Sequence, residues 1–280
     1  MRKLSFLALF SFVILQSFGQ VWKPMDSKNS ITDPKIAAAD DGNVYIVGRI
    51  HGKTASAVLY KYDGNALSTI YTPDFTKIHN DVAIGLGANQ LPIIAYSENG
   101  VAMVKQFDGK TLVDLSSESP APKGFNYFKM ATDKAGTPYV FYYHSSVFYV
   151  KKFENGSWSQ LAESKGFMGD YRIAFNSRNE PYIAFKDKRF VKRIEGGTLV
   201  DVAPTYYKSS TSEFNIAIDN NDVIYICYSA FENGVLKLVK LEGQEWKPLP
   251  DPTSADYPNK GGELPVMAFD SNNNMYFSCS

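Results

Sequence analysis

Hydrophobic and polar positions alternate with a period of two along most of this chain, in short stretches bounded by Asp, Asn and Gly. Six segments share an apolar residue followed by Ala, then a polar turn, then an apolar or aromatic run. They begin at Ile36, Val82, Met130, Ile173, Ile216 and Met267. Such alternation between turn residues predicts β-hairpins. No stretch has the periodicity of an amphipathic helix.

A second pattern follows five of these segments: "VLYKYDGNALSTI", "MVKQFDGKTLVDL", "YVKKFENGSWSQL", "FVKRIEGGTLVDV" and "KLVKLEGQEWKPL". Each has an alternating strand, an acidic residue with Gly or Asn, and a second strand that carries Leu or Trp. Four short strands in a repeat of about 45 residues are typical of a β-propeller blade. The sequence therefore predicts an all-β, six-bladed propeller over residues 20–280, with repeats that start near residues 36, 82, 130, 173, 216 and 267.

A small residue recurs in the first strand of each predicted blade. It is Ala37, Ala83, Ala131, Ala174, Ala217 and Ala268. The first strands of a propeller lie innermost, where the sheets crowd together, so close packing requires a small side chain there. This alignment needs one inserted residue in the turn of the second copy.

Acidic residues in the polar turns are expected to stabilise the first hairpin. Asp133, Asp219 and Asp270, with Asn176 as a variant, can accept hydrogen bonds from backbone amides. The stretch "DNND" at 219–222 lacks the spaced oxygen ligands of a calcium loop. We therefore predict turn chemistry and no metal site.

The two ends of the chain resemble each other. "FGQVWKPMD" at 18–26 and "EGQEWKPLP" at 242–250 share five of nine residues. Since the second segment is a fourth strand, the first is predicted to supply the fourth strand of blade 6. The last repeat stops after two strands, so either blade 6 has three strands or the chain is incomplete.

The first nineteen residues have the features of a signal peptide. Arg2 and Lys3 precede an apolar run over 4–15, and Ser17 and Gly19 supply small residues at a cleavage site. We expect cleavage after Gly19 and a secreted or periplasmic protein. No Cys follows the cleavage site, so a lipid anchor is not expected.

The charge balance indicates which classes of partner the protein can bind, and the cysteine content indicates whether it forms disulfides. Lys and Arg together number 29, as do Asp and Glu, and no run of like charges occurs. This balance speaks against a nucleic-acid partner, and no second apolar run is long enough for a membrane span. Two cysteines, Cys227 and Cys279, do not make a disulfide framework. They are predicted to be two separate buried thiols. The protein is expected to be a monomer.

Short motifs resemble a known class of repeats. "DDGNVYIV", "DKAGTPYVF" and "VKKFENG" are similar to the repeats of NHL-type and related secreted bacterial propellers. The resemblance implies a six-bladed propeller and carries no catalytic residue across. The Asp-box of sialidases, which are also six-bladed, is absent from the sequence.

No recognised catalytic motif occurs. The sequence lacks a G-x-S-x-G elbow, an H-E-x-x-H pair and a Walker-type phosphate loop. His51, His79 and His144 fall on loops of one rim, where solvated residues are favoured over a three-histidine metal site. No cofactor is predicted.

The best candidate surface is a polar ring at the mouth of a central funnel. Two residues before each recurrent Ala stand Lys35, Asp81, Lys129, Arg172, Asn215 and Val266. Five of these six are polar or charged, which suits an anionic or hydroxyl-rich ligand; the alternative is that any strand entry is polar. The same rim adds Arg49, His144 and Asp187 as candidates.

These observations favour an exported, non-enzymatic propeller that binds a glycan, a small molecule or an extracellular protein through its loop rim and funnel. The alternative is a glycan-active enzyme (a glycoside hydrolase or lyase) or a lectin-like propeller, and a third interpretation is an assembly subunit. Glycoside hydrolysis would need two facing carboxylates, and nothing selects a pair among Asp81, Asp187, Glu213 and Glu232. Trp22, Trp158 and Trp246 occupy fourth-strand positions held elsewhere by Leu, so they are predicted to pack rather than to bind sugars.

Overall fold

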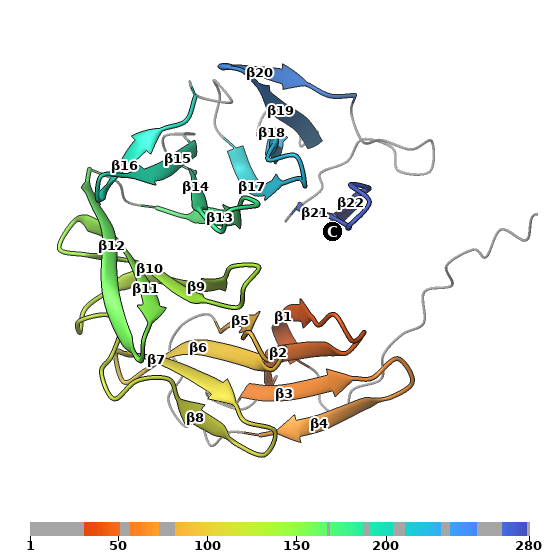
Figure 1. Cartoon of the computed structure of the whole chain (residues 1–280), viewed down its shortest axis with the longest axis vertical. Helices are drawn as coiled ribbons and strands as arrows, with labels where there is room; N and C mark the ends of the chain where they lie inside the picture. Colours follow the sequence, from red (N-terminus) through yellow and green to blue (C-terminus); the bar gives the residue numbers. More distant parts are fainter. Residues whose placement is uncertain are drawn as a thin grey trace, which may run out of the picture.

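The structure, a computed structural model, describes residues 31–50, 57–72, 82–166, 169–186, 191–203, 211–230, 236–250 and 265–278. Within these ranges the chain forms 22 strands and no helix. The strands form five four-stranded antiparallel sheets and one two-stranded sheet, arranged in a ring (Figure 1). This confirms the predicted all-β propeller: five complete blades are present, and a partial sheet stands in the sixth place.

The strands of blades 1 to 3 are β1 (Ile31–Ala38), β2 (Val44–Ile50), β3 (Ala57–Tyr62), β4 (Leu67–Tyr71); β5 (Ala83–Leu86), β6 (Pro92–Glu98), β7 (Val101–Phe107), β8 (Leu112–Asp114); β9 (Asn126–Thr132), β10 (Pro138–His144), β11 (Val147–Glu154), β12 (Ser157–Lys165). Those of blades 4 to 6 are β13 (Tyr171–Phe175), β14 (Pro181–Phe185), β15 (Val191–Glu195), β16 (Thr198–Asp201); β17 (Thr211–Ile218), β18 (Ile224–Ala230), β19 (Leu236–Glu242), β20 (Glu245–Pro248); β21 (Val266–Phe269), β22 (Met275–Ser278).

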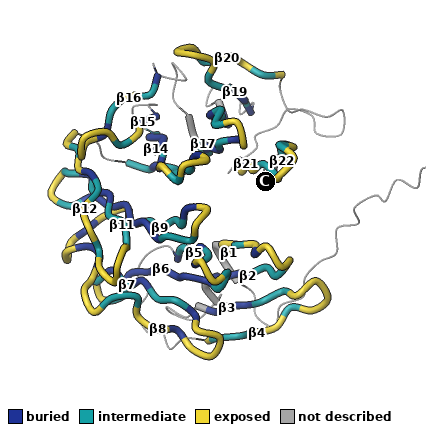
Figure 2. Tube along the Cα trace, in the orientation of Figure 1, coloured by how far each residue is buried: buried dark blue, intermediate teal, exposed yellow. Residues whose placement is uncertain are grey.

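Blades 2 to 5 each pack against a neighbouring blade through both faces of their sheets. The first strand of a blade lies nearest the middle of the ring and the fourth lies outermost (Figure 1). In the five complete blades the second strands are largely buried on both faces, as in β6 and β10 (Figure 2). The hydrophobic clusters join adjacent blades: Val47 and Leu59 of blade 1 pack with Ile94 and Tyr96 of blade 2. Burial of apolar surface between blades therefore stabilises the ring.

The strand register corrects the alignment of the second repeat. In five blades the recurrent Ala pairs with a Tyr of the second strand, as Ala131 pairs with Tyr139. In blade 2 that position is held by Gly85, opposite Ile93, and Ala83 lies two residues earlier. The predicted equivalence of Ala83 with the other alanines is therefore wrong, and no residue is inserted in the turn.

The replacement of Ala by Gly in blade 2 has a steric cause. A Cβ atom on Gly85 would lie 2.6 Å from both Cγ2 and Oγ1 of Thr132 in blade 3. Even the smallest side chain is too large for that space. A shift of two residues keeps side chains on the same face of a strand, so the hydrophobic pattern could not reveal it.

The predicted turn chemistry is confirmed. Asp133 Oδ1 accepts hydrogen bonds from the amides of Ala135 and Thr137, both at 2.9 Å. Asp219, Asp270 and Asn176 accept the corresponding pairs in blades 5, 6 and 4. Each side chain closes the first hairpin of its blade.

The same turns connect adjacent blades. At four interfaces, the amide of the second turn residue donates to a side chain at the fourth turn position of the next blade. The pairs are Asp40 to Gln90 (3.1 Å), Lys134 to Asn179 (3.1 Å), Ser177 to Asp222 (2.6 Å) and Asn220 to Asn273 (2.9 Å). Between blades 2 and 3 the fourth position is Gly136, and the backbones touch directly. We call this set of contacts the turn latch.

Further predictions concerned the tryptophans, the cysteines and the N-terminal segment. Trp158 and Trp246 pair with Phe153 and Leu241 as packing residues, as predicted. Cys227 is a buried free thiol. The N-terminal segment predicted to complete blade 6, the leader and Cys279 all lie outside the described residues. The described part of the chain contains no helix that is long and apolar enough to cross a membrane.

Candidate functional site

A chain of charged side chains joins the inner strands of blades 3, 4 and 5. Lys129 Nζ of β9 lies 2.5 Å from Asp170 Oδ1, directly before β13. Arg172 of β13 pairs with the other oxygen of Asp170, and its second amine lies 3.4 Å from Glu213 Oε2 of β17. Lys186, at the end of β14, lies 3.9 Å from Glu213 Oε1. We call these five residues the rim network.

Local structure beneath the network explains its position. The pairing of β9 with β10 shifts by one residue between Asn126 and Lys129, and Tyr127 in this bulge has φ +50°. The hydroxyl of the fully buried Tyr171 lies 2.8 Å from the carbonyl oxygen of Phe141 and close to that of Tyr127. Burial raises the pKa of Tyr171 well above its usual value, so the hydroxyl stays protonated and can donate. This contact ties blade 4 to the bulge of blade 3.

Cations are also held over aromatic rings. Lys129 Nζ donates to the carbonyl oxygen of Tyr171 at 2.6 Å and lies 4.8 Å from the centre of its ring. The guanidinium of Arg172 lies 5.2 Å from the ring of Phe214. Aromatic faces attract cations, so both side chains are positioned by more than their carboxylate partners.

Asp170 is held in its ionised form, and the network is accessible to solvent. Partial burial raises the pKa of Asp170, but the charges of Lys129 and Arg172 more than offset this, and the pKa is lowered overall. The side chains of the network are between 24% and 32% exposed. They are ordered by one another and can still reach a ligand.

The structure brings together only some of the predicted site residues. Lys129 and Arg172 belong to the rim network. Lys35 is exposed on β1 and Asn215 is half-buried on β17, and no contact joins either side chain to the network among the described residues. Arg49 pairs with Thr32 through the backbone, and its side chain lies outside the described part. Asp81 and Asp187 also lie outside it.

Sequence reasoning missed Asp170 and Lys186 as site residues, and considered Glu213 only as a catalytic carboxylate. A signal for the carboxylates was present. Asp170 stands four residues before Ala174, and Glu213 stands four residues before Ala217. With the corrected register, Asp81 stands four residues before Gly85, so it matches the carboxylate position rather than that of Lys129.

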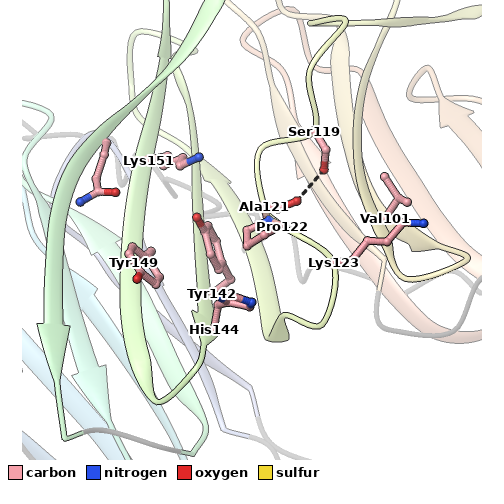
Figure 3. A pocket seen from close by; sticks show the side chains of 10 residues that line it. Val101, Ser119, Ala121, Pro122, Lys123, Tyr142, His144, Tyr149 and Lys151 are labelled. Atoms are coloured by element: carbon pink, nitrogen blue, oxygen red, sulfur yellow. Dashed lines mark hydrogen bonds between the residues drawn. The ribbon is translucent and has the colours of Figure 1, made fainter.

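A second feature lies between blades 2 and 3. A cleft of about 620 Å³ is bounded by Val101 of β7, the segment 119–123, and side chains of β10, β11 and β12 (Figure 3). His144 lines this cleft and is not part of the rim network. That His144 belongs to the funnel rim stays a prediction; it lies at the end of β10, in the cleft between blades 2 and 3.

No group of three or more His, Cys, Asp or Glu side chains that could hold a metal ion occurs within the described ranges. The rim network also offers its carboxylates to Lys and Arg rather than to an open site. The described residues therefore give no basis for a metal centre.

Comparison with solved structures identifies the same fold in several proteins. A catalytically inactive virginiamycin B lyase from Staphylococcus aureus, in complex with quinupristin, aligns over 91% of this chain and 86% of its own, with a TM-score of 0.60 and 13% identity. The PQQ-bound aldose sugar dehydrogenase of Streptomyces coelicolor aligns over 89% and 94%, with a TM-score of 0.53 and 10% identity. The periplasmic gluconolactonase of Pseudomonas aeruginosa aligns over 77% and 68%, with a TM-score of 0.53 and 13% identity.

These similarities show the β-propeller fold. No family model matches the chain, and no curated protein matches it. The resemblance to NHL-type repeats therefore rests on its short motifs. Propellers of this kind host unrelated activities, so the function must be argued from the residues of this chain.

Proposed function

We propose that this protein is an exported propeller that binds a hydroxyl-rich ligand, a glycan, at the rim network without chemically changing it. The observation that carries the proposal is the alternation of charge from Lys129 through Asp170 and Arg172 to Glu213. The leader-like segment at residues 1–19 supports export.

The alternation suits neighbouring hydroxyl groups. Each hydroxyl donates one hydrogen bond and accepts others, so it can donate to a carboxylate and accept from the adjacent cation. Hydrogen bonds to charged groups are stronger than neutral ones. The side chains of Asp170 and Arg172 are mutually ordered, so binding immobilises little further conformational freedom.

A glycan-active enzyme is the second candidate function. It is supported by the fold that this chain shares with a lyase, a gluconolactonase and a sugar dehydrogenase. A glycosidase needs a carboxylic acid whose pKa is raised so that it can protonate the leaving group. The pKa of Asp170 is lowered instead, so this carboxylate of the rim network is unsuited to that role. This supports binding over hydrolysis.

The test is a glycan array with the purified protein lacking residues 1–19, followed by titration calorimetry with the best glycan. Arg172→Gln is expected to weaken binding at least about tenfold, because a charged donor is lost. Arg178→Gln is the matched control, since Arg178 pairs with Glu180 in a turn at the opposite end of the blade. Turnover that Asp170→Asn abolishes would establish the enzyme instead, and unchanged binding by Arg172→Gln would overturn the proposed site.

A further inference from the structure

One lysine position recurs in the third strand of three blades. It is occupied by Lys105 in blade 2, Lys151 in blade 3 and Lys192 in blade 4. In blades 2 and 4 the residue directly opposite in the fourth strand is an aspartate. Lys105 Nζ lies 2.8 Å from Asp114, and Lys192 Nζ lies 2.7 Å from Asp201.

Blade 3 breaks this pattern. The residue opposite Lys151 is Gln160, so the carboxylate of the neighbouring blades is replaced by a neutral amide. Lys151 forms no ion pair with a carboxylate of the described ranges. Burial lowers the pKa of its ammonium, and the charge of Glu118 offsets this only in part. An unpaired, half-buried ammonium is unfavourable, so an anion here would be stabilised.

The unpaired lysine lies in the cleft between blades 2 and 3. Figure 3 shows its side chain pointing from β11 toward the segment that carries Ala121 and Pro122. Lys123 and His144 also line the cleft, and none of its described lining residues carries a carboxylate. The rings of Tyr142 and Tyr149 stack beside it, with centres 5.3 Å apart and planes inclined by 21°. Tyr142 is buried, whereas Tyr149 is partly exposed.

We propose that this cleft binds a carboxylate-bearing sugar, such as the uronate of an acidic glycan, with its carboxylate at Lys151. The carboxylate would take the place that Asp114 and Asp201 occupy in the neighbouring blades. The sugar ring packs against the exposed part of Tyr149, and its hydroxyls reach Gln160 and His144. The site shares no residue with the rim network, so it does not rest on the proposed function.

The experiment is titration calorimetry of the protein with trigalacturonate and, in parallel, with neutral galactotriose. The wild type is expected to bind trigalacturonate at least about tenfold more tightly, because a charge-assisted hydrogen bond is made only by the acid. Lys151→Gln should remove this preference. Lys152→Gln is the matched control: its side chain points to the opposite face of the same strand and pairs with Glu154, so affinity should be unchanged.

Gln160→Asp gives a second and sharper variant. It restores the lysine–aspartate pair of blades 2 and 4, so it should weaken trigalacturonate binding about tenfold while raising the melting temperature. A fold defect would lower that temperature instead, which separates the two causes. Equal binding of the two trisaccharides, unchanged affinity of Lys151→Gln, or equal competition by inorganic sulfate would overturn the proposal. Loss of trigalacturonate binding in Arg172→Gln alone would assign the ligand to the rim network and also overturn it.

Discussion

Ser177 donates two hydrogen bonds to the carboxylate of Asp222 in the next blade. Its amide lies 2.6 Å from Oδ1 and its hydroxyl lies 2.7 Å from Oδ2. Asp222 adopts φ +62°, a left-handed conformation that Asp and Asn tolerate better than most residues. Among the turn-latch contacts that run from an amide to a side chain, this one alone uses a charged acceptor.

The first prediction concerns this contact. The hydrogen bonds from Ser177 lower the pKa of Asp222 below its ordinary value of 3.8. Because the pKa of Asp222 is lower in the folded than in the unfolded protein, its ionised carboxylate stabilises the fold. This contribution is complete at pH values above the unfolded-state pKa and is lost as the pH falls through the folded-state pKa. Asp222→Ala should cost about 1 kcal/mol at pH 7, since solvent screens the contact, and less at pH 3. Urea unfolding at both pH values measures this.

Asp222→Asn is the control for that prediction. Asn273 and Asn179 hold the same position in other blades, so the variant keeps the conformation and one acceptor. It should lose less stability than Asp222→Ala and show no titration of the contact. An equal loss for both variants at both pH values would show that the charge contributes nothing.

The second prediction separates backbone packing from backbone conformation at two equivalent glycines. Gly136 and Gly42 occupy the same turn position, with φ +79° and +84°. A Cβ on Gly136 would lie 2.2 Å from the amide nitrogen of Ala88, whereas a Cβ on Gly42 meets nothing within 4 Å. Gly42→Ala should cost about 1 kcal/mol from its left-handed conformation, and Gly136→Ala at least about 3 kcal/mol. Equal losses in urea unfolding would contradict the close contact between blades 2 and 3.

The third prediction concerns a turn built from unsuitable residues. Ser145 and Ser146 have φ values of +51° and +64° in the two-residue turn between β10 and β11. The corresponding turn of blade 2 uses Asn99 and Gly100, the residues that such a turn favours. Ser146→Gly should therefore stabilise the protein by about 0.5–1 kcal/mol, seen as a higher melting temperature. Gly100→Ser should have the opposite effect, and a change of the same sign for both would argue against this cause.

The fourth prediction concerns the reactivity of Cys227. Burial raises the pKa of this thiol to about 12, and the thiolate is the reactive form. Alkylation of Cys227 by iodoacetamide at pH 8, followed by peptide mass spectrometry, should be at least about a hundredfold slower in the folded protein than in urea. Similar rates in both conditions would show that the thiol is accessible.

The fifth prediction tests the closing strand of the ring. The ring centres of Trp158 and Phe153 are 5.1 Å apart, and Trp158 is half-buried on its blade. Trp22 holds the corresponding position in the sequence repeat. If residues 20–25 complete blade 6, Trp22→Ala should cost at least about 2 kcal/mol and lower the melting temperature by several degrees. Lys23→Ala is the control, because its counterpart Lys247 is exposed. Equal melting temperatures for both variants would reject the closing strand.

The blade and its turns follow from local patterns of residues along the chain. Period-two alternation, the turn carboxylates and the spacing of Trp158 and Trp246 are local features, because a hairpin forms between neighbouring segments. The fourth-strand tryptophans therefore pair where the repeat placed them. The sequence also identified Lys129 and Arg172 as candidates, because both recur at one strand position.

The register of blade 2 and the partners of the site residues depend on contacts between blades. Gly85 replaces Ala because Thr132 of another blade fills the space, and a two-residue shift leaves the alternation intact. Lys129 meets Asp170 across a blade boundary, 41 residues apart in the chain. In the sequence Lys151 cannot be distinguished from Lys105 and Lys192. The pairing of β11 with β12 shows that it faces Gln160 rather than an aspartate. Packing between blades is non-local, and no local pattern encodes which side chains it brings together.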